Sequence, residues 1–213
     1  MKYLEFNERY GFSRKAGFQL TDKQINSVEE AVGYEKVLLN LEVGVGKTVM
    51  ATAVALMLGY EMNLVIVPPI LLEPWTAWLK QVGCNVVAYR GSPAQRKLIN
   101  LKEYSWVVMS HEIFRRDYSH IKSVVSKFHY SLVLDEAHAA KNPRSVLFRH
   151  ILELTAGDHG LQLLTGTPIS AIVDSYSYIK LKTPKAYRSY GHFTNTHVKE
   201  YDFFNNPKVF QIL

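Results

Sequence analysis

Two groups of residues in this chain have types and spacing suited to phosphate chemistry. The first group follows a short apolar run at positions 37–39 and consists of Gly44, Val45, Gly46, Lys47 and Thr48. Glycines let the backbone turn tightly, and the first turn of the following helix points unpaired N–H groups and a positive dipole end at the same place. Lys47 adds a mobile positive charge, and Thr48 adds a hydroxyl that can hold Mg²⁺. The segment therefore predicts a nucleotide phosphate site built largely from backbone.

The match to the general phosphate-loop pattern is incomplete, because that pattern places glycine at position 41 and this chain has Leu41 there. The alternative is a glycine-containing turn between a strand and a helix, followed by an ordinary surface lysine. The rest of the chain has to decide between these two interpretations.

The second group follows an apolar run at positions 132–134 and consists of Asp135, Glu136 and His138. In a phosphate-loop ATPase such a strand lies beside the phosphate-loop strand, and its terminal aspartate helps to hold Mg²⁺. An adjacent glutamate can deprotonate the attacking water. The alternative is that Asp135 and Glu136 only cap the next turn. Their occurrence in one chain with Gly-Lys-Thr favours the catalytic interpretation.

The elements that must position both groups alternate along the chain. Apolar runs typical of strands buried on both faces occur at 37–39, 64–67, 86–88, 106–109, 132–134 and 161–164. Helical patterns lie between them at 21–32, 47–58, 74–82, 94–101 and 146–154. This alternation predicts an α/β fold with a mainly parallel central sheet flanked by helices on both faces. Ligands of such sheets bind at the carboxyl ends of the strands, where both groups lie.

Composition limits the partners of the chain. Its net charge of +6 favours a polyanion, with nucleic acid first and an acidic membrane surface second, although many soluble domains are mildly basic. The longest apolar stretch, at 49–58, is too short to span a bilayer. The first residues lack the apolar core of a signal peptide. Cys84 is the only cysteine, which fits an intracellular setting, the cytoplasm of a microbial or host cell.

The last part of the chain differs in character from the rest. From position 187 it is rich in tyrosine, phenylalanine, histidine and asparagine and shows no clean period. We therefore expect residues 1–185 to form the domain and residues 186–213 to form an extension or the start of a linker.

Asp-Glu-Ala-His at 135–138 resembles the DEAH box of superfamily-two helicases and translocases. Segments 18–24, 64–75, 107–112 and 163–168 resemble further motifs of that superfamily, in its order. The loop that begins at Glu42 and the pair Lys141-Asn142 are similar to the Swi/Snf-like branch, which does not keep the glycine at position 41. The chain is thus identified as resembling an N-terminal RecA-like ATPase domain of that branch.

The chain also departs from the pattern of this branch. Ala137 stands where members commonly have glycine, and Ser170-Ala171 stand where remodellers commonly have Gln-Asn-like residues. These departures place the chain nearer to compact microbial or viral members. ATPases of the superfamily sandwich the nucleotide between two RecA-like domains, and the second domain supplies arginine fingers. No second domain or finger is recognisable in this sequence.

The resemblance implies ATP and Mg²⁺ as cofactors. It assigns adenine recognition to Gln24 and phosphate binding to residues 44–48. The residues implied in catalysis are Lys47, Asp135 and Glu136, and those implied in holding Mg²⁺ are Thr48 and Asp135. An alternative role exists for Gln24, since Thr21 and Gln24 also form a capping-box pattern at the start of a helix.

The resemblance further implies that His138, Thr165 and Thr167 couple the nucleotide to nucleic acid. As alternatives, His138 can be a buried histidine with satisfied hydrogen bonds, and the two threonines can simply end a strand before Pro168.

The implied partner is DNA, duplex or single-stranded, bound through its phosphates without sequence specificity. The candidate contacts are Pro69, Ser110 and His111. Basic pairs at 14–15, 115–116 and 180/182 either extend this track or form solvated faces. Trp75 and Trp78 lie three residues apart on one helix face and are expected in the core rather than as platforms for bases.

These features together predict the ATP-binding half of a DNA-dependent ATPase, a helicase-like translocase or remodeller that is weak or inactive as an isolated domain. It would need a second RecA-like domain from the same chain or a partner. The alternative is a naturally short nucleotide- and DNA-binding module that acts through a partner and is not itself a motor. A phosphate-loop kinase or GTPase has less support, because no guanine-specificity motif or lid with paired arginines is recognisable.

Overall fold

A six-stranded sheet forms the centre of the computed structural model, which describes residues 1–166, 174–201 and 207–210, with only backbone for 198–201 and 207–210. Every neighbouring pair of its strands is parallel, in the order β1-β6-β5-β2-β4-β3. The strands are β1 (Lys36–Asn40), β2 (Met62–Val67), β3 (Val86–Ala88), β4 (Trp106–Ser110), β5 (Tyr130–Leu134) and β6 (Gly160–Thr165). They confirm the six strands expected from the sequence.

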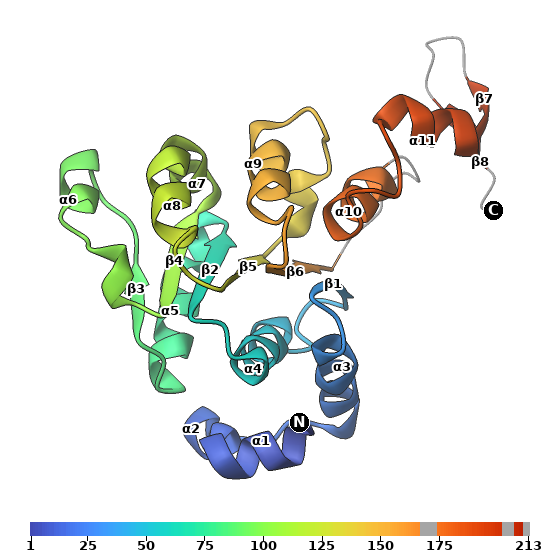
Figure 1. Ribbon diagram of the computed structural model, residues 1–213. Coiled ribbons are helices and arrows are strands. Elements are labelled where there is room, and N and C mark those ends of the chain that lie inside the picture. Colours follow the sequence, from blue (N-terminus) through green and yellow to red (C-terminus); the bar gives the residue numbers. More distant parts are fainter. Residues whose placement is uncertain (167–173, 202–206, 211–213) are drawn as a thin grey trace.

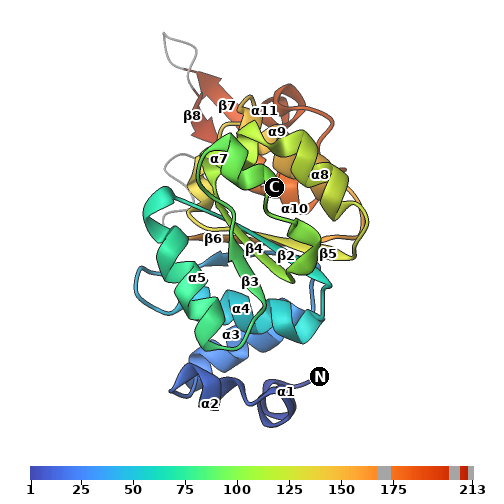
Figure 2. The same ribbon diagram turned by 90° about the vertical axis from the view of Figure 1, so that its left-hand side faces the viewer.

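Helices cover both faces of the sheet (Figures 1 and 2). One face carries α1 (Tyr3–Tyr10), α2 (Phe12–Ala16), α3 (Asp22–Val32), α4 (Lys47–Leu58) and α5 (Leu72–Gln81). The other face carries α7 (His111–Arg116), α8 (Tyr118–Val125), α9 (Val146–Leu154) and α10 (Ser175–Lys182). The expected α/β architecture with two covered faces is therefore confirmed.

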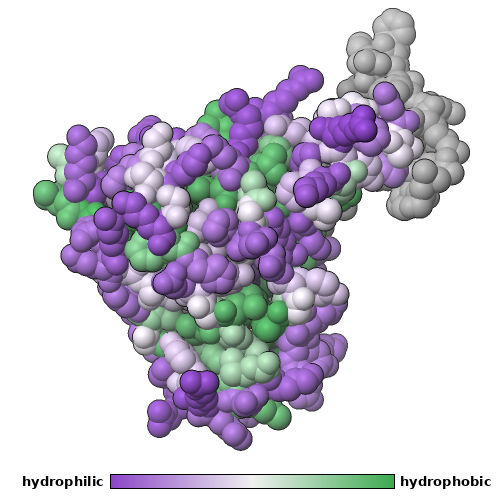
Figure 3. All heavy atoms as spheres, viewed as in Figure 1, coloured by the Kyte–Doolittle hydropathy of each residue, from purple (hydrophilic) through white to green (hydrophobic). Residues whose placement is uncertain are grey.

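Each face of the sheet has its own apolar core, because neighbouring side chains of a strand point to opposite faces. In β2, Val65 and Val67 pack toward the first set of helices, whereas Leu64 and Ile66 pack toward the second. All six residues of β2 are buried, as expected for a central parallel strand. Helix α4 lies against the sheet as predicted, and none of its residues is fully exposed. In Figure 3, apolar residues reach the surface of this face mainly in the region of α4.

The strand order corrects one expectation. We expected the strand before Asp135 to lie beside the phosphate-loop strand β1, but β6 lies between β5 and β1. Asn40 of β1 is in register with Thr165 of β6, and Leu134 of β5 is in register with Leu163. Local apolar patterns do not specify which parallel strands become neighbours, and β6 has the same apolar character as the others. The end of β6, at Thr165, and the following Gly166 thereby lie between the two predicted chemical groups.

Several boundaries also differ from the predicted ones. The helix expected at 94–101 ends early, since α6 (Pro93–Lys97) is followed by a separate 3₁₀ turn at Leu101–Glu103. Further 3₁₀ turns occur at Pro69–Leu71 and Ala137–Ala140. The part without clear periodicity contains α11 (Tyr190–His197) and a hairpin of β7 (Val198–Tyr201) and β8 (Pro207–Phe210). Whether the domain ends at residue 185 stays a prediction.

No helix within the described ranges has the length and apolar character needed to cross a membrane.

Candidate nucleotide site

The loop between β1 and α4 has the geometry of an anion site. Gly44 and Gly46 adopt left-handed backbone conformations, with φ of 86° and 87°. Side chains other than glycine disfavour this region, which explains the glycines at both positions. Gly46 is the N-cap of α4, and no side chain caps the first N–H groups of this 12-residue helix. Those N–H groups remain available to a phosphate.

Lys47 spans this loop. Its Nζ donates to the carbonyl oxygens of Leu41, at 2.9 Å, and Glu42, at 2.8 Å. Within the described part of the chain, no carboxylate pairs with this ammonium group. A Cβ added to Gly166, just after β6, would lie 3.7 Å from the Lys47 Nζ. The charge of Lys47 is thus held at the carboxyl edge of the sheet without a counter-charge.

Asp135 lies at the same edge and is 6% exposed. Its Oδ2 accepts from the Trp75 indole Nε1 at 2.8 Å, and its Oδ1 accepts from the Glu136 backbone N–H at 2.9 Å. Both donors are neutral, and none of the ion pairs found among the described residues includes Asp135. Two donors fix the orientation of the carboxylate, while its negative charge stays uncompensated.

Glu136 is the one described residue other than glycine with a positive φ, at 52°. Such a conformation is uncommon for a residue with a side chain and is concentrated at functional sites. Its carboxylate lies 3.2 Å from Nδ1 of His138, and both side chains are partly exposed. The second acid of the pair is thus partly exposed at this turn, whereas Asp135 is buried.

The predicted coupling residues have different surroundings. His138 contacts the Glu136 carboxylate. Thr165 is buried, and its carbonyl oxygen accepts from the Leu41 N–H at 3.3 Å, which joins β6 to the start of the phosphate loop. Thr167 lies outside the described residues. The coupling role of these residues stays a prediction.

Gln24 contacts both the start of its own helix and the phosphate loop. Its Oε1 accepts from the Thr21 N–H at 2.9 Å, and Thr21 in turn caps the Gln24 N–H, so the capping box is present. Its Nε2 donates to the Val45 carbonyl oxygen at 2.9 Å. The side chain therefore joins the start of α3 to the phosphate loop, and adenine recognition stays a prediction.

The three candidate DNA contacts differ in exposure. Pro69 is exposed at the start of the turn that follows β2. Ser110 is buried, and its hydroxyl accepts from the Ile113 N–H as the cap of α7. His111 lies next to it with Nε2 at 3.3 Å from the Asp135 carbonyl oxygen, and burial lowers the pKa of its ring. Of the three residues, Pro69 is exposed, His111 is partly exposed and Ser110 is buried.

Sequence reasoning missed the two tryptophans of α5 as hydrogen-bond donors to the site. Trp75 is 1% exposed, which confirms its expected place in the core. Its indole also holds Asp135, as described above, while that of Trp78 donates to Thr52 in α4 at 2.9 Å. A buried indole N–H needs an acceptor, and this requirement was the available signal.

Asp135 and Thr48 offer the hard oxygen ligands that Mg²⁺ prefers. In the part of the chain that the structure describes, no group of three or more His, Cys, Asp or Glu side chains could hold a metal by itself. Mg²⁺ at nucleotide sites is bound by one or two carboxylates together with substrate phosphates and water, so the residues present fit that ion.

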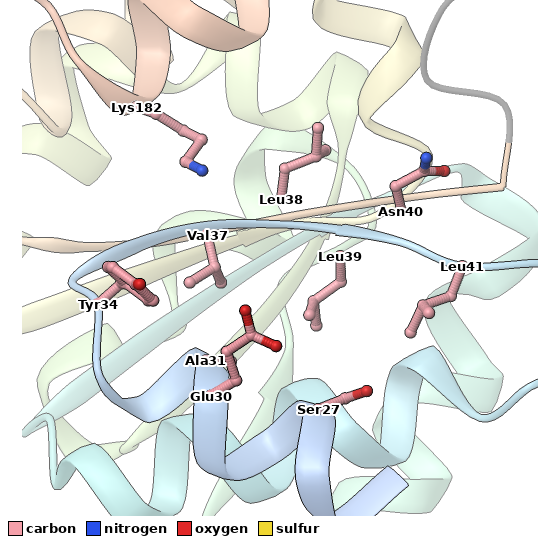
Figure 4. A pocket seen from close by; sticks show the side chains of 10 residues that line it. All are labelled: Ser27, Glu30, Ala31, Tyr34, Val37, Leu38, Leu39, Asn40, Leu41 and Lys182. Carbon is pink, nitrogen blue, oxygen red and sulfur yellow. The ribbon is translucent and has the colours of Figure 1, made fainter. Parts of the chain in front are cut away.

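A separate hollow of about 260 Å³ follows the outer edge of β1 (Figure 4). Val37 and Leu39 point toward α3, whereas Leu38 and Asn40 point to the opposite side of the strand, where Lys182 extends from α10. The hollow thus lies between α3 and α10 rather than at Lys47 and Asp135. Nothing in the described residues shows what would cover it.

Comparison with known proteins places this geometry in context. Residues 24–208 match the family described as the SNF2-related domain. The chain is 31% identical over 163 residues to "Helicase swr1" of Schizosaccharomyces pombe, which covers 67% of this chain and 12% of that protein. It is 27% identical over 199 residues to "Protein CHROMATIN REMODELING 5" of Arabidopsis thaliana, covering 81% of this chain and 11% of that protein.

Among solved structures, the fold is similar to the Sulfolobus solfataricus SWI2/SNF2 ATPase core in complex with dsDNA. The TM-score is 0.72 at 25% identity, over 84% of this chain and 39% of that chain. The chain therefore spans a small part of the curated relatives and well under half of the solved core. With a family match over residues 24–208, this chain belongs to the SNF2-related domain family.

Proposed function

We propose that this chain is the ATP-binding half of a DNA-dependent ATPase, a helicase-like translocase or remodeller. The observation that carries the proposal is that Lys47 and Asp135 reach the same edge of the sheet with charges that no described side chain neutralises. A nucleotide with its Mg²⁺ would supply both missing counter-charges.

Each residue has a stated task in this proposal. Lys47 and the free N–H groups of α4 bind the phosphates, and Thr48 and Asp135 hold Mg²⁺. Bound Mg²⁺ would neutralise charge that develops on the phosphate oxygens. Glu136, whose side chain is partly exposed, accepts the proton of the attacking water.

DNA as the partner is supported by two observations. The solved SWI2/SNF2 core that this chain resembles was determined with dsDNA, and the chain itself carries a net charge of +6. We propose sequence-independent contacts to DNA phosphates near Pro69, on the loop after β2. An intracellular location is part of the same proposal.

A second RecA-like domain, in the same chain or a partner, would supply the arginine finger. Such a finger is worth about 10³- to 10⁵-fold in rate, so we expect residues 1–213 alone to bind the nucleotide but to hydrolyse it slowly.

The test compares Lys47→Ala with Lys127→Ala, which changes an exposed lysine after α8 on the other face of the sheet. Loss of a charge-assisted hydrogen bond costs about 1.5–3 kcal/mol, so Lys47→Ala should weaken Mg-ATP binding about 10- to 150-fold. Lys127→Ala should leave the affinity unchanged. Equal affinities for wild type and Lys47→Ala would refute the assigned phosphate role. Titration with duplex DNA, single-stranded DNA and RNA separates the proposed partner from its alternatives.

A further inference from the structure

Helix α5 contacts both parts of the candidate nucleotide site through two indoles on one face. Trp75 and Trp78 lie three residues apart, and each donates its Nε1 hydrogen to a different element. These are specific polar contacts inside an otherwise apolar interface.

The first indole holds the carboxylate that would bind Mg²⁺. Trp75 Nε1 lies 2.8 Å from Oδ2 of Asp135, and both side chains are buried. Donors that orient a metal-binding carboxylate typically contribute about 10- to 100-fold to metal affinity or activity. Trp75 is therefore a positioning residue for Asp135.

The second indole reaches the phosphate loop through one intermediate. Trp78 donates to the Thr52 hydroxyl at 2.9 Å, and that hydroxyl donates to the Thr48 carbonyl oxygen at 2.8 Å. Thr48 is the other residue that would hold Mg²⁺. The ring of Trp78 also stacks on Phe18, with ring centroids 6.0 Å apart, in the segment that leads to Gln24.

The start of α5 is joined directly to the exposed turn after β2. The Leu71 N–H donates to the Pro68 carbonyl oxygen at 2.9 Å, and the Leu72 N–H donates to the Pro69 carbonyl oxygen. Two prolines and two hydrogen bonds make this connection short and stiff. A ligand that displaces Pro69 would thus displace the helix that carries both indoles.

We propose that α5 couples DNA at the turn after β2 to Mg²⁺ binding, with Trp75 and Trp78 as the positioning residues. The inference rests on the proposed function. It assigns the coupling to a path separate from His138 and the threonine motif. His111, whose ring contacts the Asp135 carbonyl oxygen, provides a further contact from the loop after β4. Couplings between two sites are typically 5- to 150-fold in affinity.

The test measures the affinity of residues 1–213 for a fluorescent ADP analogue, with and without Mg²⁺ and with and without a short duplex DNA. In Trp75→Phe, we expect the gain from Mg²⁺ to fall about 10- to 100-fold, while binding without Mg²⁺ stays at the wild-type level. In Trp78→Phe, we expect the ratio of the nucleotide affinities with and without DNA to approach one. DNA affinity without nucleotide should not change in either variant.

Two further variants serve as a control and as an independent test of the same path. Trp106→Phe changes a buried tryptophan in β4 whose indole is not among the hydrogen-bond donors described for Asp135 or Thr52, and should behave as wild type. Thr52→Val keeps the side-chain shape but removes the hydroxyl between Trp78 and Thr48, so it should reproduce Trp78→Phe even if one indole variant folds poorly.

The outcomes separate the two proposals. If wild type does not bind Mg-ADP, the proposed function fails and the coupling falls with it. If wild type binds Mg-ADP and responds to DNA while Trp75→Phe, Trp78→Phe and Thr52→Val respond equally, the coupling alone is wrong. A wild type that binds Mg-ADP without any response to DNA also overturns the coupling.

Discussion

Two polar clusters lie at the carboxyl edge of the same sheet. Charged side chains are paired in one cluster, whereas in the other they have no counter-charge among the described residues. One cluster surrounds Lys47 and Asp135, after β1 and β5. The other lies after β3 and β4, where Arg96 of α6 meets Asp117 at the junction of α7 and α8. Hydrogen bonds hold the side chains of both clusters, so hydrogen bonding alone does not distinguish the two.

The second cluster satisfies its own charges. Arg96 is 5% exposed and binds Asp117 through two nitrogens, at 2.6 and 3.0 Å, and the Tyr89 hydroxyl donates to the same carboxylate at 2.9 Å. Hydrogen bonding from Arg96 holds the pKa of Asp117 below its ordinary value, and burial raises the pKa of Tyr89 to about 12. Every charge in this cluster has its partner inside the protein.

The comparison teaches that perturbed pKa values alone do not locate this site. Shifted pKa values often mark functional residues, but structural ion pairs produce them as well. Here the closed pair of Arg96 and Asp117 has shifted pKa values although it lies apart from Lys47 and Asp135. Lys47 and Asp135 instead meet only neutral donors or acceptors. A ligand can therefore supply the counter-charges of Lys47 and Asp135.

The largest effect on ATP hydrolysis is expected when an acid of the first cluster is neutralised. Glu136→Gln removes the proposed proton acceptor but keeps the shape of a partly exposed side chain. We expect ATP hydrolysis to fall about 10²- to 10⁴-fold, because general bases contribute in that range. The free energy of unfolding should change by no more than about 0.5 kcal/mol, as for other surface substitutions. Single-turnover hydrolysis and urea denaturation measure the two quantities.

Glu112→Gln, an exposed acid in the first turn of α7, serves as the control and should hydrolyse ATP at the wild-type rate. If Glu136→Gln also keeps the wild-type rate, Glu136 is not the base.

The same change in the second cluster should act on stability instead. Asp117→Asn leaves the guanidinium of Arg96 buried without its counter-charge. Breaking a buried pair costs about 3–5 kcal/mol, and because Asp117 is partly exposed we expect about 2–3 kcal/mol, a 30- to 150-fold loss in the folding equilibrium. Nucleotide affinity of the folded protein should stay unchanged. Glu73→Gln, in an exposed pair with Arg90, should shift the urea midpoint little.

The pH dependence of this difference follows from the lowered pKa of Asp117. A carboxylate with a lower pKa in the folded state stabilises the fold above its unfolded pKa, near 4, and loses that effect as pH falls through the folded value. The difference in the free energy of unfolding between wild type and Asp117→Asn should therefore be largest at pH 7 and become smaller below about pH 4. Urea midpoints across that range test it, and a gap that grows in acid would contradict the assignment.

Both clusters also show what the sequence could predict. The apolar runs predicted all six strands, since buried parallel strands need little more than a continuous apolar segment. The glycines at 44 and 46 predicted the turn, because their left-handed conformations exclude most other residues.

The remaining features depend on distances between elements, which local patterns do not contain. The position of β6 between β1 and β5 is one example. Another is the Arg96–Asp117 pair, which joins α6 to the junction of α7 and α8 across 21 positions. The indole contact from Trp75 to Asp135 spans 60 positions and depends on how α5 crosses the sheet. Such contacts follow from the fold rather than from a motif.

Each of the two clusters has a capping box beside it, and the two boxes are nearly identical. Thr21 and Gln24 begin α3 beside the phosphate loop, and Ser92 and Gln95 begin α6 beside the second cluster. In each box the glutamine Oε1 accepts from the N-cap N–H, at 2.9 and 2.8 Å. Only Gln24 has an additional contact, from Nε2 to the Val45 carbonyl oxygen, among the contacts described for the two glutamines.

Glutamate keeps the accepting oxygen of the box and removes the amide donor. Gln95→Glu should therefore leave stability and nucleotide affinity near wild type. Gln24→Glu turns a carboxylate toward the Val45 carbonyl oxygen and the proposed phosphate site, so we expect ATP affinity to fall about tenfold, or about 1.4 kcal/mol. Measuring GTP in parallel separates two roles for Gln24. An equal loss for both nucleotides indicates support of the loop, whereas a larger loss for ATP indicates recognition of adenine. Identical behaviour of the two variants would show that Gln24 is a helix cap and no more.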